Sequence, residues 1–352
     1  MPASFFCCHP STIHFVNDIF AIAKVLDKFI IIMSNIDCYL TVNSEMCYNF
    51  YMRKTIIIDE ECVKDEPKEV EKLLDENKKI NFNISKKFRK ELFSKFAKAI
   101  KTYELLKPND KVAVCVSGGK DSFLMAKLFL ELKTHNKFSF ELVFLVMDPG
   151  YSKKNREKIE KNGEILDIPL TIFSSDIFEN VVNIEKSPCY ICARMRRGHL
   201  YAKAKELGCN KIALGHHFDD VIETILMGVL YGAQVQTMMP KIKSKNFEGM
   251  ELIRPMYLIR EKDIIAWKDF NKLSFLQCAC KFTEQNYFQN ERENEISSKR
   301  KMMKNLIANL AKDDPQIEDN IFKSVENVNL ATVIAYKDKS GGKHHFLDDF
   351  DS

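Results

Sequence analysis

The sequence predicts an α/β fold, a doubly wound parallel sheet with helical additions at its N-terminal and C-terminal ends. Between residues 111 and 230, short apolar runs alternate with segments of helical periodicity. Such alternation is typical of parallel strands that are joined by crossover helices. Glycine or polar turns follow the apolar runs, where ligands bind in sheets of this kind. The composition supports a globular protein, since 45% of the residues are hydrophobic and 29% are charged.

The expected elements follow one another in strand–helix order. The first apolar run, KVAVCVS, ends in a glycine turn. We expect strands at 111–117, 142–147, 170–174 and 211–214, and helices at 121–134, 153–166, 194–207 and 219–230. Two further helices are expected between residues 291 and 328, separated near Asp313, Asp314 and Pro315.

A basic amphipathic helix is expected before the first strand. Apolar residues recur at helical spacing from Phe88 to Tyr103, and Ser85 is available as the N-cap. The other face of this helix carries Lys86, Lys87, Arg89, Lys90, Lys95, Lys98 and Lys101. A solvated helix surface and a surface that contacts RNA are equally good interpretations of this face.

These elements divide the chain into four parts. Residues 1–84 are expected to form an N-terminal extension of unknown role, for which partial disorder and a true start at Met52 are open alternatives. Residues 85–290 form the main domain, residues 291–337 a C-terminal helical segment, and residues 338–352 a flexible tail.

Charge and cysteine content limit the function classes. The net charge of +4 is only mildly basic, so a polyanionic partner must be argued from local charge clusters. The eleven cysteines are expected to be thiols in a reducing cytosol, because the N-terminal residues do not form a secretory signal. The apolar stretch from Ile19 to Met33 is interrupted by three charged residues and is too short to span a membrane. We therefore expect a cytoplasmic protein without a membrane segment.

The motif SGGKDS follows the first strand and begins a helix. Its two glycines let the backbone approach an anion, the helix N-terminus offers free N–H groups, and Lys120 adds a charged donor. Asp121 is placed to help hold a Mg²⁺ ion that bridges phosphate oxygens. The motif therefore predicts a phosphate-binding turn. Its residues are Ser117, Gly118, Gly119, Lys120, Asp121 and Ser122.

A pair of cysteines precedes the third expected helix of the sheet domain. Cys189 and Cys192 are separated by two residues, a spacing that lets both thiolates bind one metal ion or iron–sulfur cluster. Arg194, Arg196 and Arg197 follow directly. Such a basic patch lowers the pKa of thiols and attracts phosphates, including those of RNA. Arg196 is a candidate catalytic residue in this patch.

The motif GHHFDD begins at the end of the fourth strand. Because ligands bind at the carboxyl ends of parallel strands, Gly215 and His216 are expected to contact the nucleotide, together with Asp148 after the second strand. Asp219 and Asp220 are candidates for moving a proton or positioning a metal ion. The alternative is that the two histidines are hydrogen-bonded scaffold.

The motif QCAC offers a third thiolate, from Cys278 or Cys280. Side chains two residues apart in an extended segment point to opposite faces, so only one of the two is expected to join Cys189 and Cys192. Three thiolates on a four-iron cluster would leave one iron open for a sulfide or a substrate atom. The alternative is that both cysteines are buried as small apolar residues.

Taken in order, the motifs SGGKDS, PCYICARMRRG, LGHHFDDVIET, RPMYLIREKDI and QCAC resemble those of the TtcA family of tRNA cytidine thiolases. The resemblance covers about residues 86 to 337. It implies a fold of the PP-loop ATP pyrophosphatase type, ATP and Mg²⁺ at the SGGKDS loop, and a [4Fe-4S] cluster on Cys189, Cys192 and Cys278. Family members often have CxxC where this chain has CAC, so Cys280 remains an alternative to Cys278.

The reaction that the resemblance implies is thiolation of cytidine 32 in tRNA. Transfer of AMP to the C2 oxygen would turn this oxygen into a good leaving group, and sulfide would replace it. Lys120 and the amides of the glycine turn would neutralise the pyrophosphate. The implied partners are tRNA and a sulfur donor such as a cysteine desulfurase, with a homodimer as a further alternative.

Three other functions remain open. A lysidine or amide ligase would share the phosphate loop but has no use for clustered thiols. A 2-thiouridine synthase usually carries additional paired cysteines for zinc, which Cys7, Cys8, Cys38, Cys47 and Cys62 do not form. A zinc-stabilised RNA-binding module would release no AMP in the presence of tRNA.

Overall fold

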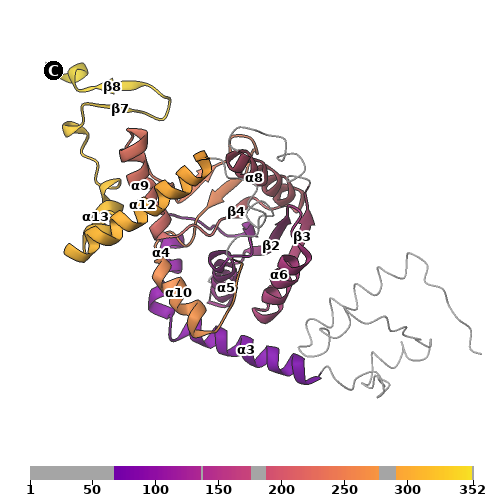
Figure 1. Cartoon of the computed structure of the whole chain (residues 1–352). Coiled ribbons are helices and arrows are strands. Elements are labelled where there is room, and N and C mark those ends of the chain that lie inside the picture. Colours follow the sequence, from indigo (N-terminus) through magenta and orange to yellow (C-terminus); the bar gives the residue numbers. More distant parts are fainter. Residues whose placement is uncertain (1–66, 136–137, 176–187, 277–290, 351–352) are drawn as a thin grey trace, which may run out of the picture. The chain divides into compact units, whose positions relative to one another are not determined.

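The structure is a computed structural model of the chain, and it describes residues 67–135, 138–175, 188–276 and 291–350 (Figure 1). These residues belong to one compact unit, Asp65–Ser352. None of the described helices is both long enough and apolar enough to cross a membrane.

A six-stranded sheet forms the centre of this unit. The strands are β1 (Lys111–Cys115), β2 (Glu141–Asp148), β3 (Leu170–Ser174), β4 (Lys211–Ala213), β5 (Lys241–Lys243) and β6 (Glu251–Ile253). Their order is β3-β2-β1-β4-β6-β5, and all neighbours are parallel except β5, which runs antiparallel to β6. The predicted doubly wound sheet is confirmed. Because the strand order reverses between β1 and β4, the loops after these two strands border the crevice where such sheets bind ligands.

Helices cover both faces of the sheet (Figure 1). They are α3 (Pro67–Ser85), the π-helical turn η3 (Arg89–Phe93), α4 (Ser94–Thr102), α5 (Lys120–His135), α6 (Lys153–Ile165), α8 (Pro188–Glu206), α9 (Phe218–Gly232), α10 (Glu261–Phe270), α12 (Glu291–Asp313) and α13 (Ile317–Ser324). Val112 and Val114 of β1 pack in the core that contains α5, whereas Ala113 and Cys115 pack in the core that contains residues of α8. All four side chains are buried, which explains why this strand is one continuous apolar run in the sequence.

A second, smaller core joins α9 to the C-terminal helices α12 and α13. Phe218 of α9 stacks on Phe322 of α13 with 4.6 Å between ring centroids, and Ile307 of α12 belongs to the same cluster. Ala99 of α4 and Tyr257 complete this core. The C-terminal helices therefore cover an apolar face of α9.

The start of the compact unit differs from the sequence-based expectation. Ser85 ends α3, and its Oγ donates to the carbonyl of Phe82 at 3.2 Å, so the prediction of Ser85 as an N-cap is wrong. Ile80 and Ile84 of α3 are buried in the main core. The sheet domain therefore includes at least one helix before residue 85.

The C-terminal residues form a hairpin. Strands β7 (Ala335–Lys337) and β8 (Lys343–His345) pair in the antiparallel direction. The second of these strands lies in the segment 338–352, where the sequence predicts a flexible tail.

Candidate active site

The glycine turn, residues Ser117–Ser122, connects β1 to α5 beside the crevice between β1 and β4. Ser122 fixes its shape, because its Oγ donates to the carbonyl of Gly119 at 2.9 Å and accepts from the first backbone N–H of the turn at 3.1 Å. Gly118 has a φ of 89°, in the left-handed region that favours glycine. A backbone bond of 3.1 Å from the N–H of Leu276 to the carbonyl of Gly118 attaches a distant segment to the turn.

The backbone donors of the glycine turn suit an anion. The first N–H groups of α5 have no acceptor within the helix and lie at its positive dipole end. A Cβ atom at Gly119 would be in ordinary van der Waals contact, with its nearest heavy atoms at 3.8 Å, whereas a Cβ at Gly118 would meet Leu276 at 3.0 Å. The free donors at the start of α5 are what a nucleotide phosphate requires.

Lys120 is held between two carboxylates. Its Nζ lies 3.1 Å from Oδ1 of Asp121 and 3.2 Å from Oε1 of Glu261, the first residue of α10. Burial works against the charge of Lys120, but Asp121 and Glu261 raise its pKa above the ordinary value. Glu261 also forms an ion pair with Lys304 of α12. One carboxylate is therefore shared between the glycine turn and a C-terminal helix.

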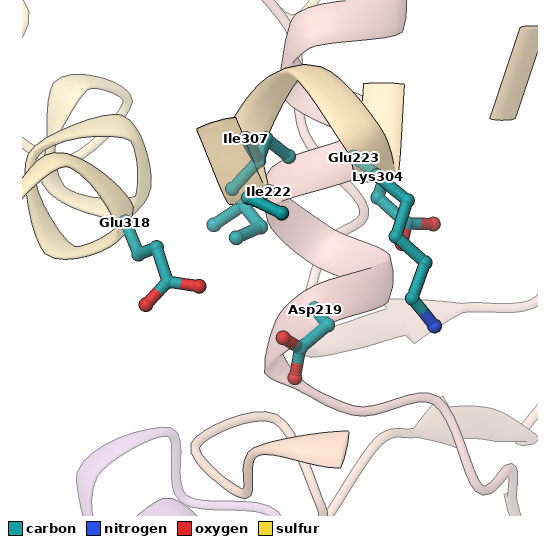
Figure 2. A pocket seen from close by; sticks show the side chains of 7 residues that line it. Asp219, Ile222, Glu223, Lys304, Ile307 and Glu318 are labelled. Carbon is teal, nitrogen blue, oxygen red and sulfur yellow. The ribbon is translucent and has the colours of Figure 1, made fainter. Parts of the chain in front are cut away.

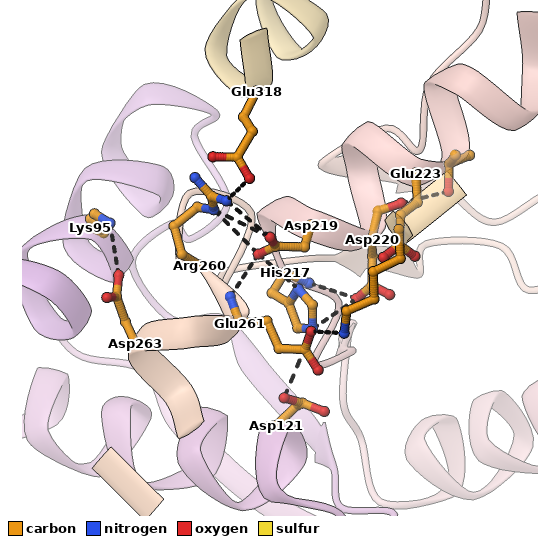
Figure 3. A network of polar contacts seen from close by, with 12 residues as sticks. Lys95, Asp121, His217, Asp219, Asp220, Glu223, Arg260, Glu261, Asp263 and Glu318 are labelled. Carbon is orange, nitrogen blue, oxygen red and sulfur yellow. Dashed lines mark hydrogen bonds and ion pairs between the residues drawn. The ribbon is translucent and has the colours of Figure 1, made fainter. Parts of the chain in front are cut away.

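Buried His217 lies among three carboxylates (Figure 3). Its Nε2 is 3.9 Å from Oδ1 of Asp121 and 3.5 Å from Oδ2 of Asp220. Its Nδ1 is 3.7 Å from Oδ2 of Asp219. The backbone N–H of His217 also donates to Oδ2 of Asp220 at 3.0 Å and so caps α9. This histidine connects the start of α5 with the start of α9.

Both carboxylate oxygens of Asp219 accept hydrogen bonds from the start of α10 (Figure 3). It accepts from the backbone N–H of Glu261 at 2.6 Å and from Nη2 of Arg260 at 3.2 Å. Arg260 forms a second ion pair with Glu318 of α13. Asp219 therefore fixes the first turn of α10 relative to α9, which in turn places Glu261 against Lys120.

Asp220 differs from Asp219, because it faces α12. Its Oδ1 lies 3.3 Å from Nη1 of Arg300, and the Nε of Arg300 lies 3.4 Å from Glu223. Beside this contact, a cavity of about 100 Å³ lies between α9, α12 and α13 (Figure 2). Its lining residues are Asp219, Ile222, Glu223, Lys304, Ile307, Ala308 and Glu318. It is smaller than the roughly 300 Å³ of typical ligand pockets, so the crevice at the glycine turn remains the candidate site.

The loop after β4 brings His216 to the crevice. A Cβ at Gly215 would lie 3.3 Å from backbone atoms of Asp121 and Ser122, so this loop touches the start of α5. Burial, with the positive charge of nearby Arg254, lowers the pKa of His216 to about 4. The imidazole is therefore neutral at neutral pH. Its buried Nδ1 has no hydrogen-bond partner within the described parts of the chain.

Asp148 is bound by its own loop at the end of β2. Its Oδ1 accepts from the backbone N–H groups of Gly150 at 2.8 Å and Tyr151 at 2.7 Å, and its Oδ2 lies 3.0 Å from Nη1 of Arg156. These contacts shape the connection from β2 to α6. A contact of Asp148 with the nucleotide stays a prediction.

Topology places the start of α8 at the same edge of the sheet as the glycine turn. Since α8 leads into β4, its last turn lies where the strands begin, and Cys189 and Cys192, in its first turn, lie at the edge where the strands end. Arg196, one turn later, is partly buried. Cys278, Cys280 and the side chains of Cys189 and Cys192 lie outside the described residues. Among the residues that are described, no three His, Cys, Asp or Glu side chains are arranged to hold a metal ion.

The predicted residues therefore gather mainly around one crevice. The glycine turn, Gly215 and His216 lie in contact or in adjacent loops, and Asp220 reaches them through His217. Sequence reasoning missed His217 and Glu261 as members of the site. A signal was present, since these charged or polar residues lie in the GHHFDD and RPMYLIREKDI motifs.

The chain is similar to known families and proteins. Residues 88–299 match the ATP_bind_3 family, a PP-loop domain. The tRNA-cytidine(32) 2-sulfurtransferase of Alcanivorax borkumensis is 34% identical over 246 residues, which cover 69% of this chain and 82% of that protein. The protein of the same name from Coxiella burnetii is 32% identical over 246 residues, covering 69% of this chain and 91% of the relative.

A solved structure shares the fold. The U34-tRNA thiolase NcsA from Methanococcus maripaludis, with its [4Fe-4S] cluster, aligns with a TM-score of 0.51 at 23% sequence identity. The alignment covers 67% of this chain and 79% of that one.

Proposed function

Because the chain belongs to the PP-loop family of tRNA-cytidine(32) 2-sulfurtransferases, we propose that it thiolates cytidine 32 of tRNA in an ATP-dependent reaction. One observation on this chain supports the proposal independently of its family membership. The free N–H groups at the start of α5 and the start of the helix that bears Cys189 and Cys192 lie at the same edge of one sheet. A nucleotide and a thiolate-bound sulfur source could thus meet at one substrate base.

The glycine turn would bind the phosphates of ATP. The amides at the start of α5 donate to phosphate oxygens, and Lys120 exchanges its contact with Glu261 for the pyrophosphate charge. Asp121 is the proposed protein ligand for Mg²⁺, which commonly binds through one or two carboxylates together with phosphate oxygens. The role of these residues is to hold the α-phosphate in line with the C2 oxygen of cytidine.

The sulfur site would be formed by Cys189, Cys192 and one cysteine of the CAC motif. NcsA, which shares the fold, carries a [4Fe-4S] cluster. In this chain, such a cluster would supply sulfide from an iron without a protein ligand. A cysteine desulfurase in the cytoplasm is the proposed source of the sulfur.

Asp219 is not suited to moving a proton. Both of its oxygens already accept hydrogen bonds from Arg260 and from the backbone of Glu261. Asp219 would serve the reaction by positioning α10. His216, whose pKa is lowered to about 4, is too weak a base to hold a proton at neutral pH, so its neutral imidazole would act as a hydrogen-bonding group in the crevice.

The proposed function is tested with protein purified without oxygen. The protein is incubated with tRNA, ATP, Mg²⁺ and sulfide, and the digested tRNA is analysed by mass spectrometry for thiolated nucleosides. We expect one AMP for each 2-thiocytidine, and neither product with Lys120→Ala. Formation of 2-thiouridine, or AMP without any thiolated nucleoside, would contradict the proposal.

The third cluster ligand is tested separately. Cys278→Ala and Cys280→Ala proteins are purified without oxygen, and iron and sulfide per chain are measured. We expect Cys278→Ala to lose the cluster and Cys280→Ala to keep it. The opposite result would assign Cys280, and two variants with full iron content would exclude the three-cysteine site.

A further inference from the structure

Arg254 is a buried cation that has no carboxylate partner among the described residues. It follows directly after β6 and is 7% exposed. Its Nη1 donates to the carbonyl of Met239, and its Nε is buried without a hydrogen-bond partner among the residues that the structure describes. No described carboxylate lies within ion-pair distance of it, in contrast to buried Lys211, which pairs with Asp110 and Glu251.

The surroundings of Arg254 do not neutralise its charge. Burial is the largest of the influences that together lower its pKa to about 10. Tyr257 and Tyr201 partly oppose burial, and the smaller effects of Arg197 of α8, which lowers the pKa, and Asp220, which raises it, come after them. The guanidinium nevertheless remains charged at neutral pH. A buried charge without a partner is strongly unfavourable, so this position is costly unless an anion binds there.

The position of Arg254 separates it from the nucleotide phosphates. The glycine turn follows β1, and Arg254 follows β6, with β4 between these two strands. Neighbouring strands are about 4.8 Å apart, so the two sites are separated by about 10 Å across the sheet edge. One nucleotide of an RNA strand fits between them.

We propose that Arg254, together with Arg197, binds a backbone phosphate of the RNA substrate next to the cytidine that reacts. This inference rests on the proposed function. A guanidinium suits the role, because its planar donors match two oxygens of a phosphate. The contact would hold the RNA strand at β6 while the base lies between the glycine turn and α8.

The competing explanation is that Arg254 only holds the loop that contains Met239. In that case its replacement should destabilise the protein, as should Lys211→Met, which leaves two carboxylates without their cation. If the role of Arg254 is instead to bind a phosphate of the RNA, Arg254→Met should leave the melting temperature of the free protein unchanged or raise it.

The test uses the full chain with unmodified tRNA in the absence of ATP. Affinity is measured over a range of salt concentrations for the wild type, Arg254→Met and Arg254→Lys, and ATP affinity is measured in parallel. We expect Arg254→Met to weaken tRNA binding about tenfold and to lower the slope of log affinity against log salt by about 0.7 to 0.9. Arg254→Lys should recover the slope, and ATP affinity should not change.

Two results would overturn the inference. A loss of ATP affinity with normal tRNA binding would assign the phosphate to the nucleotide. A lower melting temperature with an unchanged salt slope would make Arg254 structural. The inference is judged from tRNA binding without turnover, whereas the proposed thiolation is judged from the modified nucleoside. A failure of the inference is therefore distinguishable from a failure of the proposed function.

Discussion

Lys120 is the residue whose charge the proposed chemistry needs most directly. Its ammonium is partly buried between Asp121 and Glu261 at the start of α5. We predict that Lys120→Ala lowers tRNA-dependent AMP formation by about 10²- to 10³-fold, as loss of a donor to developing negative charge does elsewhere. Iron content should be unchanged. The matched control is Lys95→Ala, since Lys95 pairs with Asp263 of the same α10 at 3.1 Å without contacting the glycine turn.

His216 gives the protein a specific dependence of stability on pH. Its pKa is about 4 in the folded state and about 6.5 in the unfolded chain. Between these values the unfolded state binds more protons, so the stability from the neutral imidazole is complete above about pH 6.5 and is lost as the pH falls towards 4. Melting temperatures measured from about pH 7 to about pH 5 should fall less for His216→Gln than for the wild type. His135→Gln is the control, because His135 is exposed; equal slopes for both variants would contradict this prediction.

At the level of elements, we expect the first turn of α10 to change the affinity of the proposed nucleotide site. Glu261 shares its charge between Lys120 and Lys304, and both cations lower its pKa against the opposing effect of burial. Glu261→Gln would remove the competitor of the ATP phosphates at Lys120. We predict that the Kd for ATP falls about threefold to tenfold, the range of a partly exposed ion pair. Asp263→Asn alters the same turn but affects Lys95 instead, and it should leave ATP binding unchanged in the same titration.

The elements that follow one simple periodicity could be predicted from the sequence. Strands β1 to β4 and helices α5, α6 and α9 lie close to their expected positions, because each buried strand is a short apolar run next to a helical pattern. Strands β5 and β6 contain only three residues each, too few for a period to show. The prediction of Ser85 as an N-cap was wrong because a serine is compatible with either end of a helix. Only the packing of Ile84 and Phe88 in the core determines that Ser85 lies at the C-terminal end of α3.

At the level of the whole molecule, the C-terminal segments differ in importance. Helices α12 and α13 cover Phe218, Ile222 and Ile225 of α9, whereas the hairpin β7–β8 contributes no residue to the buried cores of the described chain. A chain that ends after residue 328 should keep its melting temperature within a few degrees. A chain that ends after residue 290 should lose about 2 kcal/mol for each apolar side chain that is uncovered and should aggregate. Thermal unfolding of both truncated proteins checks this, and equal behaviour would contradict it.

The site could be predicted only where a single motif contains it. The glycine turn is contiguous in the sequence, so its proposed role in phosphate binding can be predicted from SGGKDS alone. Lys120 and Asp219 both contact Glu261, 141 and 42 residues away along the chain, and Asp220 contacts Arg300, 80 residues away. Only the fold brings these residues of α10 and α12 to the site. Ion pairs between residues so far apart in the chain produce no periodic pattern, so a single sequence does not predict them.

The hydrogen bond from the N–H of Leu276 to the carbonyl of Gly118 links the glycine turn to the segment that precedes the CAC motif. Leu276 is followed, after one residue, by Cys278, and its N–H is bound to the carbonyl of the turn that would receive the phosphates of ATP. Any rotation of the peptide after Gly118 that accompanies phosphate binding must stretch or release this bond. Binding of a nucleotide would then change this one backbone contact, and with it the position of the segment that leads to the proposed sulfur site.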